Sequence, residues 1–170
     1  MSSRLEYAKQ PVSRTFAGPQ GHPFHPILVT VPIGAWISSF VFDIASHIVA
    51  EPGFLSQGSQ WLIAIGGLAA IVAAVVGFLD LLVIPPSTPA FSTGLWHMSL
   101  NLAVIAAYVA NFLWRSGQYS DPSAVDIGPL VLSAVSIATL AASGYLGGKL
   151  AYRYGVRVVS ESAQSDGYRS

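Results

Sequence analysis

The sequence contains no cysteine among its 170 residues and has very few charged side chains. Without cysteine the chain cannot form disulfides, bind a metal through thiolates or use a thiol nucleophile. Only 9% of the residues are charged, whereas in soluble domains the share is about a quarter. So few charges cannot cover the surface of a water-soluble globule. The net charge is zero, and no basic patch indicates nucleic-acid binding.

Charges are almost missing from four apolar stretches, at about 27–49, 60–84, 95–114 and 128–152. Each has roughly 20–25 residues, enough for an α-helix to cross a hydrocarbon core of about 30 Å. Because lipid offers the backbone no hydrogen-bond partners, such spans should be helical. The sequence therefore predicts an all-α integral membrane four-helix bundle, with helices at about 26–49, 60–84, 95–114 and 128–152.

The other segments flank this bundle. We expect a polar N-terminal leader at 1–20, a transmembrane domain at 21–158 and a flexible C-terminal tail at 159–170. The first apolar run is longer than the core of a signal peptide, so we expect it to be a retained anchor. No internal repeat is apparent.

The cations are unevenly placed along the chain. The loops at 51–59 and 115–127 hold only Arg115. The others lie before the first span or around the end of the last: Arg4, Lys9, Arg14, Lys149, Arg153, Arg157 and Arg169. By the positive-inside rule this asymmetry predicts that both termini are cytoplasmic.

Two of the four histidines lie in the string Gly-His-Pro-Phe-His-Pro at 21–26, just before the first apolar run. Pro26 suits the first turn of a helix, and Pro32 should kink that helix because the carbonyl of Leu28 loses its N–H donor. Asp80 ends the second span and His97 begins the third. Since these ends share one side of the membrane, we expect a cluster at the cytoplasmic face: His22, His25, Asp80 and His97.

Polar residues also follow one face of the third span at helical spacing. Polar groups that face lipid are costly, so this stripe should face the bundle interior. It consists of His97, Asn101, Tyr108, Asn111 and Arg115. On the first span Asp43 and His47 are four residues apart and could contact each other. This predicts a second polar cluster near the outer side, where Tyr108, Asn111 and Arg115 also lie.

Several short segments occur together in this chain. They are Gly-His-Pro-Phe-His-Pro-Ile-Leu-Val at 21–29, Pro-Ile-Gly at 32–34, Asp43, Gly-Phe-Leu-Asp at 77–80, His97 with Asn101, Gly-Tyr-Leu-Gly-Gly-Lys at 144–149 and Tyr-Gly-Val at 154–156. In these segments the chain resembles a bacterial membrane family called domain of unknown function 2231. The resemblance covers about residues 21–158. It implies a multi-pass protein of the bacterial inner membrane with four helices, and it implies no settled activity.

Histidines at a membrane boundary favour a cofactor site, because imidazole is the commonest metal ligand and a standard axial ligand of haem. We expect a b-type haem or a single metal ion, serving membrane electron transfer, bound by His25, His97 and His22. Asp80 and Asn101 would orient the ligands through hydrogen bonds.

Two alternatives remain open. The polar clusters could only fix helix packing, in an accessory subunit of a larger membrane complex or in a homo-oligomer. Alternatively, Asp43 and Asp80 could handle protons or ions, although four helices are few for alternating access. No catalytic residue stands out, because the sequence lacks a nucleophile elbow, a His-Glu-x-x-His motif and a phosphate-binding glycine loop.

Overall fold

The computed structural model describes residues 8–10, 23–117 and 119–168. In this part of the chain every regular element is a helix, so the all-α prediction is confirmed. The elements are α2 (Phe24–Leu28), α3 (Thr30–Ser46), α4 (Gly53–Leu82), α5 (Pro89–Ser116), α6 (Ile127–Gly148), a π-helical turn η3 (Lys149–Arg153) and α7 (Glu161–Asp166).

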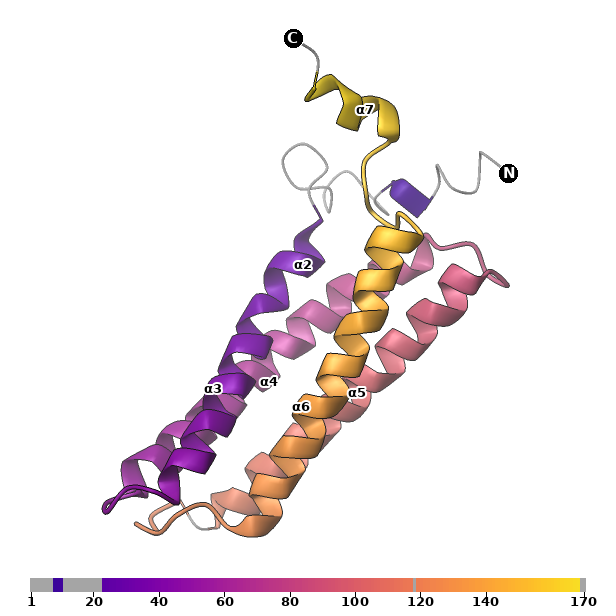
Figure 1. Ribbon diagram of the computed structural model, residues 1–170. Coiled ribbons are helices and arrows are strands. Elements are labelled where there is room, and N and C mark those ends of the chain that lie inside the picture. The colour runs from indigo at the N-terminus through magenta and orange to yellow at the C-terminus, as the bar shows by residue number, and fades with distance from the viewer. Residues whose placement is uncertain (1–7, 11–22, 118, 169–170) are drawn as a thin grey trace.

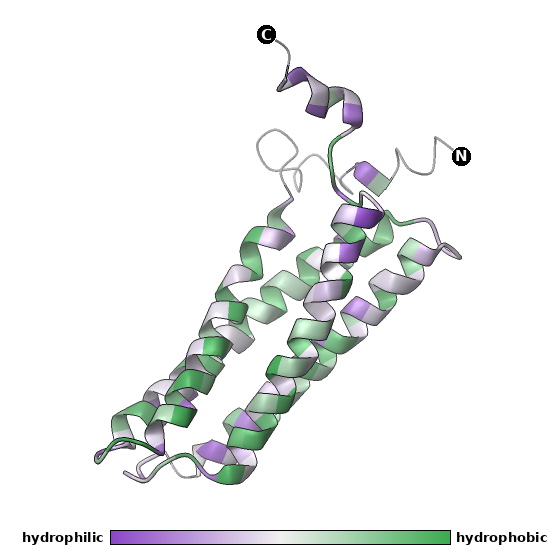
Figure 2. Ribbon diagram, viewed as in Figure 1, coloured by the Kyte–Doolittle hydropathy of each residue, from purple (hydrophilic) through white to green (hydrophobic). Residues whose placement is uncertain are grey.

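Four helical segments are long and apolar enough to cross a membrane: Phe24–Ser46, Gly53–Leu82, Pro89–Ser116 and Ile127–Arg153. They pack side by side as an up-and-down bundle (Figure 1). Apolar residues make up most of these helices, and most of the hydrophilic residues lie near the helix ends (Figure 2). The predicted four-helix bundle is therefore confirmed.

The first span is interrupted where its proline predicts. Pro32 has no N–H to donate to the carbonyl of Leu28, and the helix breaks at Val29, between α2 and α3. Backbone hydrogen bonds resume on both sides of the break, from Val29 N to His25 O and from Ile33 N to Val29 O. The break leaves α2 as a separate short turn that carries His25.

Some helix bounds differ from those expected from hydropathy. α4 begins at Gly53 rather than near 60, and α5 begins at Pro89 rather than near 95. Thr88 caps α5 by accepting a hydrogen bond from Phe91 N at 3.1 Å, and Pro89 follows at the first helical position. Hydropathy marks the apolar part of a span, whereas caps and prolines decide where the helix starts.

The segment expected to form the C-terminal tail contains the short helix α7. Ser160 caps α7 by accepting a hydrogen bond from Ala163 N, and Glu161 lies in its first turn. Of the expected leader, only residues 8–10 are described, and the rest of it lies outside the described residues.

The two ends of the bundle are named here after their polar residues. At the histidine end, which holds His25 and His97, α2 and α5 begin and α4 and α6 end. At the arginine end, which holds Arg115, α3 and α5 end and α4 and α6 begin (Figure 1). Between them lies a core of Trp36, Ile63, Ala70, Val104 and Tyr108. Trp36 and Tyr108 stack with their ring centroids 4.3 Å apart and their planes inclined by 11°.

Candidate functional site

The two histidines of the described cluster lie close together at the histidine end. His25 on α2 and His97 on α5 have ring centroids 6.3 Å apart and planes inclined by 86°. They come from opposite halves of the chain. His25 lies just before the interruption at Val29, and His97 lies in the first part of the capped helix α5.

Hydrogen bonds to the backbone define the tautomer of both rings. His25 Nδ1 lies 3.0 Å from the carbonyl oxygen of Ala73, and His97 Nδ1 lies 2.8 Å from that of Ser143. A carbonyl only accepts hydrogen bonds, so each Nδ1 must carry the proton. In the neutral imidazole the Nε2 atom is then an unprotonated acceptor. Both rings therefore have the electron pair of Nε2 available for a ligand.

Asn101, one turn after His97, completes the hydrogen bonding around that ring. Its amide nitrogen donates to His97 O at 2.8 Å and to Ser143 Oγ at 2.7 Å. These two bonds use both of its N–H groups, although the same nitrogen lies 3.3 Å from His97 Nε2. Asn101 therefore supports His97 through Ser143, and its amide also lies within hydrogen-bond distance of the acceptor Nε2.

Glycines on the neighbouring helices make room for both rings. A Cβ atom at Gly77 would lie 2.8 Å from His25 Cε1, and one at Gly147 would lie 3.0 Å from His97 Cε1. Larger residues at these positions would push the imidazoles out of place. The close approach thus depends on the small residues of α4 and α6.

In the described part of the chain, Asp80, which the sequence offered as a group to orient an imidazole, makes no hydrogen bond to His25 or His97. Its Oδ1 lies 3.0 Å from Nε of Arg157 in an ion pair. Arg157 reaches α4 because the chain turns back after η3, with a positive φ at Gly155 and Arg157. The backbone carbonyls of α4 and α6 take over the orienting role that was expected of Asp80.

His22, the third expected ligand, lies outside the described residues. Within the described part of the chain no group of three or more His, Cys, Asp or Glu side chains is arranged to hold a metal ion. Among the described residues, the possible metal ligands at the histidine end are therefore the imidazoles of His25 and His97.

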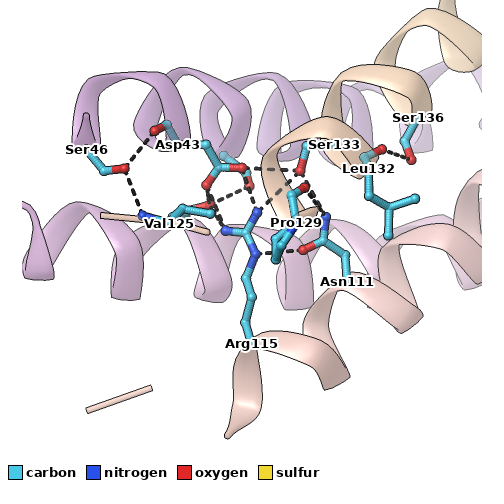
Figure 3. A network of polar contacts seen from close by, with 11 residues as sticks. Asp43, Ser46, Asn111, Arg115, Val125, Pro129, Leu132, Ser133 and Ser136 are labelled. Atoms are coloured by element: carbon cyan, nitrogen blue, oxygen red, sulfur yellow. Dashed lines mark hydrogen bonds and ion pairs between the residues drawn. The ribbon is translucent and has the colours of Figure 1, made fainter. Parts of the chain in front are cut away.

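The arginine end is built around a buried ion pair between Asp43 on α3 and Arg115 on α5 (Figure 3). The two groups meet in a bidentate arrangement, with both N–O distances 2.7 Å. The side chain of Asp43 is 0% exposed and that of Arg115 is 6% exposed. Such a pair is strong only when its remaining donors and acceptors are also satisfied.

Every N–H of Arg115 has a partner. Nε donates to Asn111 Oδ1 at 2.6 Å, and each terminal nitrogen adds a serine to its bond with Asp43. These serines are Ser59 on α4, at 2.9 Å, and Ser133 on α6, at 3.4 Å. Both hydroxyls donate in turn to the carboxylate of Asp43. The network thus joins all four spans and leaves no donor of Arg115 free.

His47 does not join this network, although Asp43 was its expected partner. It lies just after α3 with an exposed side chain. The carboxylate of Asp43 is occupied by Arg115, Ser59 and Ser133. The i, i+4 spacing fails here because α3 ends at Ser46, so residue 47 is no longer on the helix.

A small cavity of about 40 Å³ opens beside the network. Gln60, Arg115 and Tyr119 line it together with Asp121. Hydrogen bonds from Ser123 hold the pKa of Asp121 below its usual value. The volume suits water molecules rather than an organic substrate.

Several residues at the two ends were missed from the sequence. The partner of Asp43 is Arg115, which the sequence placed on the same outer side without pairing the two, and the partner of Asp80 is Arg157. A usable signal existed for the first pair, since one acid and one base lay at the same depth on different spans. Ser59, Ser133 and Ser143 gave no such signal, because serine is common in membrane helices that only pack.

Length, hydropathy and buried polar contacts together define an α-helical integral membrane protein with four candidate spans. The family model described as "Predicted membrane protein (DUF2231)" matches residues 21–160, and the chain belongs to this family. Neither a curated protein nor a solved structure matches the chain.

Proposed function

We propose that the protein binds a haem or a redox-active metal ion between His25 and His97 and serves electron transfer in the membrane. The observation that carries the proposal is the pair of imidazoles whose Nδ1 atoms are both bound to backbone carbonyls. Metal-binding histidines usually donate their second nitrogen in this way, which fixes the ring and raises its basicity. A structural histidine needs no such matched pair.

A b-type haem fits this donor set better than a bare ion. Haem iron needs only one or two axial ligands from the protein, and imidazole is a common one. A bare ion would need further donors beyond the two imidazoles, and His22 is the candidate third ligand. His25 and His97, whose ring centroids lie 6.3 Å apart, would supply the two imidazoles.

The chain's own residues would hold and orient the group. The carbonyls of Ala73 and Ser143 keep the two Nε2 atoms unprotonated, and Asn101 holds Ser143 in place. When bound, a haem or metal ion would supply a one-electron carrier at this end of the bundle.

We also propose that the histidine end faces the cytoplasm of a bacterial inner membrane. The buried pairing of Arg115 removes the one cation that the sequence places near the opposite loops. The remaining cations lie toward the chain termini, so the charge asymmetry is stronger than a simple count indicates.

The test is the visible absorption spectrum and elemental analysis of the full-length protein, purified in mild detergent from cells supplied with iron and a haem precursor. We expect a Soret band or about one metal ion per chain. His25→Ala and His97→Ala should each abolish it. His47→Ala is the matched control, because this exposed histidine lies at the other end of the bundle, and it should bind as the wild type does.

A colourless, metal-free wild type would contradict the proposal, as would equal binding by all three variants. In that case the accessory-subunit alternative, tested by co-purification from native membranes, would take its place.

A further inference from the structure

Three residue pairs meet on the axis between the two halves of the bundle, and the members of each pair are 72 positions apart. They are His25 with His97, Trp36 with Tyr108, and Asp43 with Arg115. The equal spacing shows that the first span and α5 run parallel and in register. Each half is a helical hairpin: the first comprises residues 24–82 and the second residues 89–148.

The two hairpins also share their internal packing, which register alone does not require. His25 bonds the carbonyl of Ala73, 48 positions later, and its ring packs on Gly77, one turn further. His97 bonds the carbonyl of Ser143, 46 positions later, and its ring packs on Gly147, again one turn further. Each histidine is thus held in the same way by the second helix of its own hairpin.

The sequences of the first span and α5 agree at the shift of 72, whereas the equivalent positions of α4 and α6 named above are 70 apart. Beyond the histidines, identical residues occur at Leu28 and Leu100, Ile33 and Ile105, Ala35 and Ala107, and Phe40 and Phe112. Aromatic residues occupy equivalent positions, 72 apart, at Phe24 and Trp96, at Trp36 and Tyr108, and at Phe42 and Trp114. This corrects the impression that the sequence has no internal repeat. The repeat is faint because lipid-facing apolar residues exchange freely.

We infer that the chain is a duplicated helical hairpin, and that the opposite charges of Asp43 and Arg115 make the two unlike hairpins pair with each other. In a two-fold arrangement a residue on the axis meets its own equivalent. Two first hairpins would bring Asp43 against a second Asp43, and two second hairpins would oppose two arginines. Like charges at a buried contact exclude the wrong partner. The inference is independent of any ligand on the histidines.

Full-length chains with single charge reversals test the inference. Asp43→Arg and Arg115→Asp each place like charges on the axis, so each variant expressed alone should lose roughly tenfold or more in folded, monodisperse protein. Expressed together with different affinity tags, the two chains can exchange hairpins and restore two ion pairs. We expect them to co-purify in equal amounts as a dimer. Two differently tagged copies of Asp43→Arg are the matched control and should not recover.

A second variant tests the same point within one chain. It exchanges the charged residues between the hairpins through Asp43→Arg and Arg115→Asp. It also exchanges the residues one turn before them, through Ser39→Asn and Asn111→Ser, so that each charged residue keeps its neighbour. Recovery of the folded monomer, or of the co-expressed dimer, supports the inference. Failure of both to recover would overturn it, as would single reversals that fold as well as the wild type.

Discussion

The two ends of the bundle treat their polar groups in opposite ways. At the arginine end the donors of Arg115 and the carboxylate of Asp43 are satisfied by protein atoms from all four spans. At the histidine end two imidazoles are fixed through one nitrogen each, and the other nitrogen of each is left as an acceptor. In the proposed function, the histidine end is distinguished by imidazole nitrogens that remain acceptors at rigid positions, and neither burial nor charge alone would single it out.

The same comparison bears on proton or ion handling. A carboxylate that moves protons needs access and a changing set of partners. Asp43 is fully buried and bonded on both oxygens, so the geometry favours a structural role for it. Asp80 is partly exposed and paired with a single arginine, which makes it the weaker contact of the two.

The largest expected effect comes from breaking the buried pair. Arg115→Met leaves the carboxylate of Asp43 in the bundle interior without a cation, which should lower the free energy of unfolding by about 3–5 kcal/mol. The measurement is equilibrium unfolding in mixed micelles. His47→Ala, an exposed change at the same end, should shift it by less than about 0.5 kcal/mol.

Adding Asp43→Leu to Arg115→Met removes the unpaired charge and should recover part of the loss. If Arg115→Met lowers the free energy of unfolding no more than His47→Ala does, the buried ion pair does not stabilise the bundle, and the contrast between the two ends fails.

The sequence predicts the position of the histidines better than it predicts the partners of the carboxylates of Asp43 and Asp80. The spans, the break near Pro32 and the joint depth of His25 and His97 follow from hydropathy, proline chemistry and helix direction. The pairing of Asp43 does not, because the local i, i+4 rule offered His47 as a partner, whereas the partner is 72 positions away. The pairing of Asp80 depends on a turn after η3 with two left-handed residues, which local periodicity does not reveal.

The next effect concerns the packing of the histidine end. In Gly77→Ala the added methyl would lie 2.8 Å from His25 Cε1, so the ring or α2 must shift, at a cost of about 1–3 kcal/mol. Gly67→Ala, on the same helix, meets nothing within 4 Å and should be neutral or stabilising. Thermal unfolding of the two variants compares them directly. Equal stability would mean that the rings are not held by the close approach to α4.

A smaller effect is expected from the ion pair at the histidine end. Arg157→Gln removes the partner of Asp80, whose side chain is 21% exposed, although the side chain of Arg157 itself is only 6% exposed. The loss should lie between the value of about 1 kcal/mol for an exposed pair and the loss in Arg115→Met, and added salt should reduce it through screening. Unfolding midpoints at low and high salt measure this. A loss as large as that of Arg115→Met would make the two ends alike in their electrostatics.

The smallest effect separates the aromatic core from both ends. Tyr108 stacks on Trp36, yet its buried hydroxyl has no hydrogen-bond partner among the described residues. A buried unpaired hydroxyl destabilises the folded state, so Tyr108→Phe should keep the stack and leave the free energy of unfolding unchanged or raise it by up to about 1 kcal/mol. Tyr108→Leu, which loses the stack, should be clearly less stable. If Tyr108→Phe is as damaging as Tyr108→Leu, the hydroxyl bonds a group inside the bundle, and the satisfied network of the arginine end extends into the core.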